Sequence, residues 1–119
     1  MLDKAGQKGT GKWTAQIALD LAVPIPTIAA AIDARVLSSM KDERVAASKV
    51  LHGPSEKPNV ADRKQFIADV HDALYVSKIC SYAQGMALIQ AGSREWNWSL
   101  HIAESARPWE AGCPTRPAP

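Results

Sequence analysis

The sequence predicts a single all-α domain, and three observations support this. Alanine is abundant, whereas the chain has only one Phe and two Tyr, a composition that favours helices over strands. Apolar residues recur every three or four positions along most of the chain, and we find no clear strand and no internal repeat. A length of 119 residues with 46% apolar content is sufficient for one domain but not for two.

Two helices are expected in the first half of the chain. The first begins at Lys12 with Thr10 as its N-cap, and the prolines within residues 23–26 end it, because proline lacks a backbone donor. The second is long, with Thr27 as its N-cap and an end near His52, before a Gly-Pro pair. Their apolar positions are Trp13, Ile17, Leu21, Ile28, Ile32, Leu37, Met40, Val45 and Val50.

Two further helices are expected after a polar loop. Asp62 caps the third, which continues for about thirty residues to Gly92 and needs a large neighbouring surface to cover its apolar side. Ser99 caps a short fourth helix over residues 100–106. The segment from Arg107 onward contains four prolines and is expected to be non-helical.

The composition argues against several classes of protein. The formal charge of +2, without a long basic run, gives no basis for nucleic-acid or membrane binding. No apolar run reaches the roughly 18 residues that span a bilayer, and Met1 is followed by Asp3 and Lys4 rather than by the apolar stretch of a signal peptide. Cys80 and Cys113 lack metal-site spacing and are typical of reduced thiols, so the expected compartment is the cytoplasm.

A glycine-rich stretch near the start is the first candidate site. Residues 6–14, GQKGTGKWT, match most of the phosphate-loop pattern GxxxxGK[ST], but Trp13 stands where a hydroxyl would bind magnesium and no apolar strand precedes the loop. A triphosphate site is therefore not expected. A simpler anion site at a helix N-terminus remains open, with Lys8, Thr10 and Lys12 adding charge and a hydroxyl. A solvated entry loop accounts for these residues equally well.

Arg35 is the second candidate. It lies in a largely apolar helical stretch whose only other charged residue is Asp33. Such an arginine either pairs with a carboxylate and reaches to water, or binds a phosphate or carboxylate with two hydrogen bonds. The residues alone favour the first interpretation. The histidines have no ligand spacing, and GxSxG, HExxH and GxGxxG are absent, so no reaction can be named at this point.

Several short sequence blocks indicate more than composition and periodicity do. Several blocks closely resemble, in the same order, the C-terminal helical domain of 6-phosphogluconate dehydrogenase: AGQKGTGKWT, AR-LSS-KDERVAASKVL-GP, ALY-SKI-SYAQG and GC--R. The resemblance runs from about Leu2 to Trp109. It implies that residues 1–109 are a partial all-α domain of that enzyme, with two long helices plus shorter ones and no Rossmann domain. Residues 110–119 would be a proline-rich irregular tail.

The resemblance also implies a function. Members of the family oxidise and decarboxylate 6-phosphogluconate to ribulose 5-phosphate with NADP, in the pentose phosphate pathway and gluconate utilisation, as homodimers. Lys8, Thr10 and Arg35 match positions that bind the substrate phosphate. The cofactor loop and the catalytic lysine and glutamate of the family match nothing in this sequence. We therefore expect no catalytic, cofactor-binding or metal residue here, and no activity from this segment alone.

Two departures from the family pattern stand out. Asp33 replaces an aromatic residue and is close enough in sequence to pair with Arg35, while Pro114 and Pro117 should block the helix with which the family continues. The decay after Trp109 is typical of a truncation or a frame disturbance. The alternative function is a non-catalytic helical module that binds a sugar phosphate or pairs with a full-length subunit. Uncovered apolar stripes on the long helices predict self-association.

Overall fold

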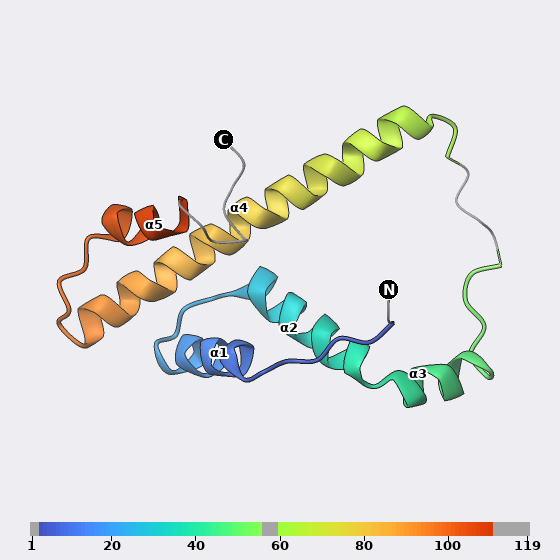
Figure 1. The fold of residues 1–119 in the computed structure, drawn as a ribbon, viewed down its shortest axis with the longest axis horizontal. Helices are drawn as coiled ribbons and strands as arrows, with labels where there is room; N and C mark the ends of the chain where they lie inside the picture. Colours follow the sequence, from blue (N-terminus) through green and yellow to red (C-terminus); the bar gives the residue numbers. More distant parts are fainter. Residues whose placement is uncertain (1–2, 56–59, 111–119) are drawn as a thin grey trace.

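The computed structural model describes residues 3–55 and 60–110, with backbone only for the last two. The described part contains five helices and no strand, which confirms the predicted all-α class. Figure 1 shows α4 as a long rod, with α2 and α5 against its C-terminal half and α1 packed on α2. The helices are α1 (Thr10–Asp20), α2 (Pro26–Ser39), α3 (Lys41–Ser48), α4 (Arg63–Glu95) and α5 (Ile102–Glu110).

The start of α1 differs from the prediction. Gly9, not Thr10, is the N-cap residue: it has φ 109° and its carbonyl accepts from Trp13 N at 3.0 Å. Only glycine adopts this left-handed conformation without strain, so the turn into the helix falls one residue earlier than expected. Thr10 is the first helical residue, and its side chain is exposed instead of capping the helix.

The expected long second helix is interrupted at Met40, where ψ is 49°. The Ser39 hydroxyl donates to the Val36 carbonyl at 2.6 Å, and Arg44 binds the Ser38 carbonyl from outside the helix, so both groups stabilise an end to α2. The expected cap is also wrong, because α2 begins with Pro26 at its first position, leaving Thr27 inside the helix.

The third predicted helix is confirmed as α4, which has 33 residues. The Asp62 carboxylate accepts from Lys64 N at 2.9 Å and from Gln65 N at 3.0 Å, which is the predicted cap. The helix continues three residues beyond the predicted end at Gly92, as far as Glu95.

The last helix was predicted with the wrong bounds. α5 begins at Ile102, preceded by the His101 carbonyl, which accepts from Ser105 N, so Ser99 is not its cap. It also continues through Pro108, although a non-helical segment was expected from Arg107. Pro108 removes a single backbone donor in the last turn, and the Arg107–Glu104 ion pair (3.1 Å) stabilises that turn. The predictions for Cys113, Pro114 and Pro117 concern positions outside the described residues.

The molecule is open. Its radius of gyration is 18.4 Å, whereas a compact domain of this length has about 13.5 Å. Ala18 and Ile25 are the buried apolar side chains of the described part. The N-terminal half of α4 leaves an apolar stripe uncovered, as predicted, with Phe66 50% and Leu74 71% exposed. No helix among the described residues combines the length and apolar character that crossing a membrane requires.

Candidate functional site

The candidate site is a cavity of about 370 Å³ between the start of α1 and one face of α2. All three residues predicted to bind phosphate, Lys8, Thr10 and Arg35, line it. The other lining residues are Gln7, Gly11, Ile28, Ala31 and Ile32. The structure therefore brings together side chains from the glycine-rich loop and from a helix about 25 residues further on.

Local geometry explains why these elements meet. Ile28, Ile32 and Arg35 follow one another at intervals of four and three residues, which places them on the same face of α2. Gly11 faces this surface: a Cβ there would lie 3.1 Å from Ile32 Cγ1. The glycine thus permits the first turn of α1 to approach α2 closely. Ile28, Ala31 and Ile32 supply the apolar part of the lining, and Lys8 and Arg35 supply its cations.

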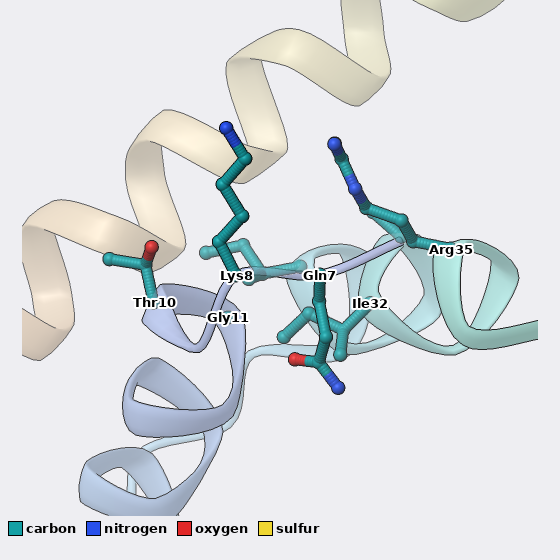
Figure 2. A pocket seen from close by; sticks show the side chains of 8 residues that line it. Gln7, Lys8, Thr10, Gly11, Ile32 and Arg35 are labelled. Carbon is teal, nitrogen blue, oxygen red and sulfur yellow. The ribbon is translucent and has the colours of Figure 1, made fainter. Parts of the chain in front are cut away.

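The two cations extend to the same side. In Figure 2 the Lys8 ammonium and the Arg35 guanidinium point the same way, and the Thr10 hydroxyl also lies on that side, whereas Gln7 and Ile32 point away. The first turn of α1 leaves backbone N–H groups without intrahelical acceptors beside them. Such groups and the positive end of the helix dipole favour an anion.

Arg35 is oriented by the loop itself. Its Nε donates to the Gly6 carbonyl at 2.6 Å, which leaves the two terminal nitrogens with no acceptor among the described residues. Asp33 forms no ion pair with Arg35 in that part of the chain, because residues two apart on a helix face different directions. Asp33 therefore does not compete with a ligand for the Arg35 guanidinium. The two terminal nitrogens of Arg35 can donate two parallel hydrogen bonds to an anion.

Lys12, which first suggested a nucleotide loop, does not line the cavity. No cluster of metal-ligating side chains occurs in residues 3–55 and 60–110. The apolar part of the lining was not predicted from the sequence, although the spacing of Ile28, Ile32 and Arg35 could have indicated it. It also missed Ser38 and Arg44, whose contacts with the N-terminal segment carry no local signal.

Comparison with known proteins agrees with this architecture. The family model of the 6-phosphogluconate dehydrogenase C-terminal domain matches residues 1–118. The decarboxylating 6-phosphogluconate dehydrogenase of Synechococcus elongatus is 58% identical over 113 residues, which are 95% of this chain and 24% of that protein. The NADP(+)-dependent, decarboxylating enzyme of Bacillus subtilis is 53% identical over 118 residues, 99% of this chain and 25% of its own. The chain thus spans about a quarter of the length of these relatives.

A solved structure gives the same result. Plasmodium falciparum 6-phosphogluconate dehydrogenase, described in its apo form and in complexes with NADP+ and with 6-phosphogluconate, superimposes with a TM-score of 0.79 at 42% identity. The match covers 95% of this chain and 24% of that one. The helices and the sequence blocks are therefore those of one known domain. The chain belongs to the 6-phosphogluconate dehydrogenase C-terminal domain family.

Proposed function

We propose that this chain supplies the substrate-phosphate contacts of an NADP-dependent, decarboxylating 6-phosphogluconate dehydrogenase. The names of the relatives support the activity of the whole enzyme. The observation that carries the role of this segment is the common cavity of Lys8, Thr10 and Arg35. A phosphate ester is the substrate group that suits a guanidinium fork, an ammonium, a hydroxyl and free backbone N–H groups.

The contribution to catalysis is orientation. A dianion fixed at one end of the sugar acid holds the distant reacting carbon in one position relative to the cofactor, and such positioning is a large part of an enzymatic rate enhancement. In the whole enzyme, NADP bound outside this segment would supply the hydride acceptor. The 119 residues contain no GxGxxG motif, and we assign neither cofactor-binding nor acid–base residues to them.

Phosphate recognition can be tested by calorimetry with 6-phosphogluconate. Lys8→Ala and Arg35→Ala are compared with Lys12→Ala, a control that removes the same charge four residues further on, in the first turn of α1, but not from the cavity. Because a hydrogen bond to a charged group contributes about 1.5–3 kcal/mol, Arg35→Ala should weaken binding by about tenfold or more. Gluconate, which lacks the phosphate, should bind weakly if at all. Equal effects of Lys8→Ala and Lys12→Ala would refute the assignment.

The role without catalysis has its own test. We expect the 119-residue chain, incubated with 6-phosphogluconate and NADP, to produce no NADPH absorbance above a reaction without protein. An enzymatic rate would show that acid–base and cofactor groups are present in a segment to which we assign none.

A second function rests on the uncovered face of α4. Phe66, Ile67, Val70 and Leu74 lie on one side of the helix and are all at least 50% exposed, and an apolar stripe of this length is typical of a surface that another chain covers. We propose that this face pairs with a second subunit, as a homodimer. Sedimentation velocity over a hundredfold range of concentration tests this, and a monomer throughout that range would exclude it for this chain.

A further inference from the structure

The segment that leads into the cavity is held in place by α2 and α3. Residues 3–8, which we call the N-terminal strap, form no helix and run beside α2 in Figure 1. Asp3 contacts Arg44, Ala5 N donates to Ser38 Oγ at 3.0 Å, and the Gly6 carbonyl accepts from Arg35. From Asp3 to Gly6 along the strap, the residues contacted have decreasing sequence numbers, from Arg44 to Arg35. The strap therefore runs antiparallel to α2. These contacts fix its register on that helix.

Arg44 forms the most extensive of these contacts. Its Nη2 donates to the Asp3 carbonyl at 2.9 Å, to Asp3 Oδ1 at 3.2 Å and to the Ser38 carbonyl at 3.2 Å, while Nη1 donates to Asp3 Oδ2 at 3.3 Å. The Ser38 carbonyl lies in the last turn of α2, where it has no intrahelical donor. One guanidinium therefore joins the start of the strap to the end of α2. A lysine ammonium cannot present this planar fork.

The strap determines where Lys8 lies. Lys8 follows Gly6 by two residues, and no described residue accepts from its ammonium. Its position near Arg35 thus depends on the backbone that carries it. Two cations at one cavity repel each other when no anion is present, and the strap opposes that repulsion. Because the site is already ordered before an anion binds, binding costs less conformational entropy and is stronger.

Electrostatics at the far end of the strap agrees with this arrangement. Hydrogen bonds from Arg44, then its charge and that of Lys41, hold the pKa of the Asp3 carboxyl below its ordinary value of 3.8. The contact between Asp3 and Arg44 therefore stabilises the ionised form of Asp3. Asp3 remains 69% exposed and Arg44 36% exposed, so the pair is a local clasp and not part of a core.

We propose that Arg44 is a positioning residue of the anion cavity, which clasps Asp3 and so holds the strap that presents Lys8 beside Arg35. The inference rests on the proposed phosphate-binding function, since it assigns a support to that same cavity. Arg44 does not line the cavity and acts only through the strap.

The test uses the 119-residue chain and inorganic phosphate, with binding followed in ¹H–¹⁵N spectra. Asp3→Asn makes the chain more positive, so simple charge attraction predicts tighter phosphate binding, whereas the clasp predicts weaker binding by about two- to fivefold. Arg44→Lys keeps the charge and should weaken binding at least as much. The double variant should bind like the weaker single variant, because both remove the same clasp. Arg94→Lys, an exposed arginine of α4, is the matched control.

Hydrogen exchange of the Ala5 amide supplies a readout that needs no ligand. It should accelerate in both clasp variants and stay unchanged in Arg94→Lys. Asp3→Asn keeps the test decisive if Arg44→Lys perturbs folding, because the Asp3 side chain is exposed and contacts Arg44. Phosphate binding by Asp3→Asn as tight as in the unmodified chain, or tighter, would overturn the inference alone. Absence of phosphate binding by the unmodified chain would overturn the proposed function and the inference with it.

Discussion

Gln84 holds α2 against α4, and its replacement gives the sharpest test of the fold. Its Oε1 accepts from Thr27 N at 3.0 Å and from Ile28 N at 3.3 Å, and its Nε2 donates to Thr27 Oγ1 at 2.9 Å. Pro26 has no N–H, and Ala29 N donates to the Ile25 carbonyl. The side chain thus supplies the acceptor for the two donors that the first turn of α2 leaves without one. It caps that helix from a position 57 residues away.

Gln84→Met keeps the length of the side chain and removes these hydrogen bonds. Each is worth about 1 kcal/mol net, and because the two amides are only part-buried, water recovers some of that loss. We expect the first turn of α2 to lose about 1–2 kcal/mol, which is a five- to thirtyfold change in its opening equilibrium. Native-state hydrogen exchange at Thr27 and Ile28 should accelerate by that factor.

The control variant is Gln84→Glu. A carboxylate accepts from both amides, the Thr27 hydroxyl can rotate to donate, and a negative charge at a helix N-terminus is favourable by about 0.3–1 kcal/mol. Protection should therefore be kept or increased. Gln90→Met, on an exposed part of α4, should have no effect at these amides. Exchange within twofold of the unmodified chain in Gln84→Met, or equal acceleration in Gln84→Glu, would refute this account of the cap.

Three further outcomes are expected. In Gly92→Ala the new Cβ would lie 2.8 Å from Trp96 Cζ3, so the ring must shift, which should destabilise the fold by about 1–3 kcal/mol. The near-ultraviolet circular dichroism spectrum should therefore change while the helix content stays the same. An unchanged near-ultraviolet spectrum would contradict this. The stabilisation from Asp3, whose pKa is lowered, is present above pH 3.8 and lost as the pH falls through the lowered value; the Ala5 amide shift should follow that titration and be flat in Asp3→Asn, and a midpoint above 3.8 would contradict it. The double variant Phe66→Glu, Leu74→Glu should self-associate less in sedimentation velocity, because two carboxylates disrupt the exposed apolar stripe. Unchanged sedimentation would exclude a role of this stripe in self-association.

The parts of the fold that could be predicted are those with local signals. Asp62 caps α4 with its own side chain, and the apolar period after it runs through most of that helix, so its start and type were predictable. The break at Met40 was not, because it depends on the Ser39 hydroxyl and on Arg44 reaching back to the Ser38 carbonyl. A helical pattern that continues through a break cannot reveal such a competition.

The site divides in the same way. Lys8, Thr10 and Arg35 came from sequence blocks of the family, and the structure places them around one cavity. The supports of that cavity, such as the contact between Arg44 and Asp3, join residues 41 apart in sequence. Pairing at that separation follows from how the chain folds back, and neither spacing nor propensity contains it.

The openness of the molecule gives these polar supports unusual importance. With Ala18 and Ile25 as the buried apolar side chains of the described part, no large core fixes α1 against α2. A phosphate bound between Lys8 and Arg35 would itself join the strap to α2. Anything that binds only the assembled form stabilises it by mass action, so ligand and clasp should reinforce each other. The affinity of the cavity should therefore follow the integrity of the strap more closely than the overall stability of the helices.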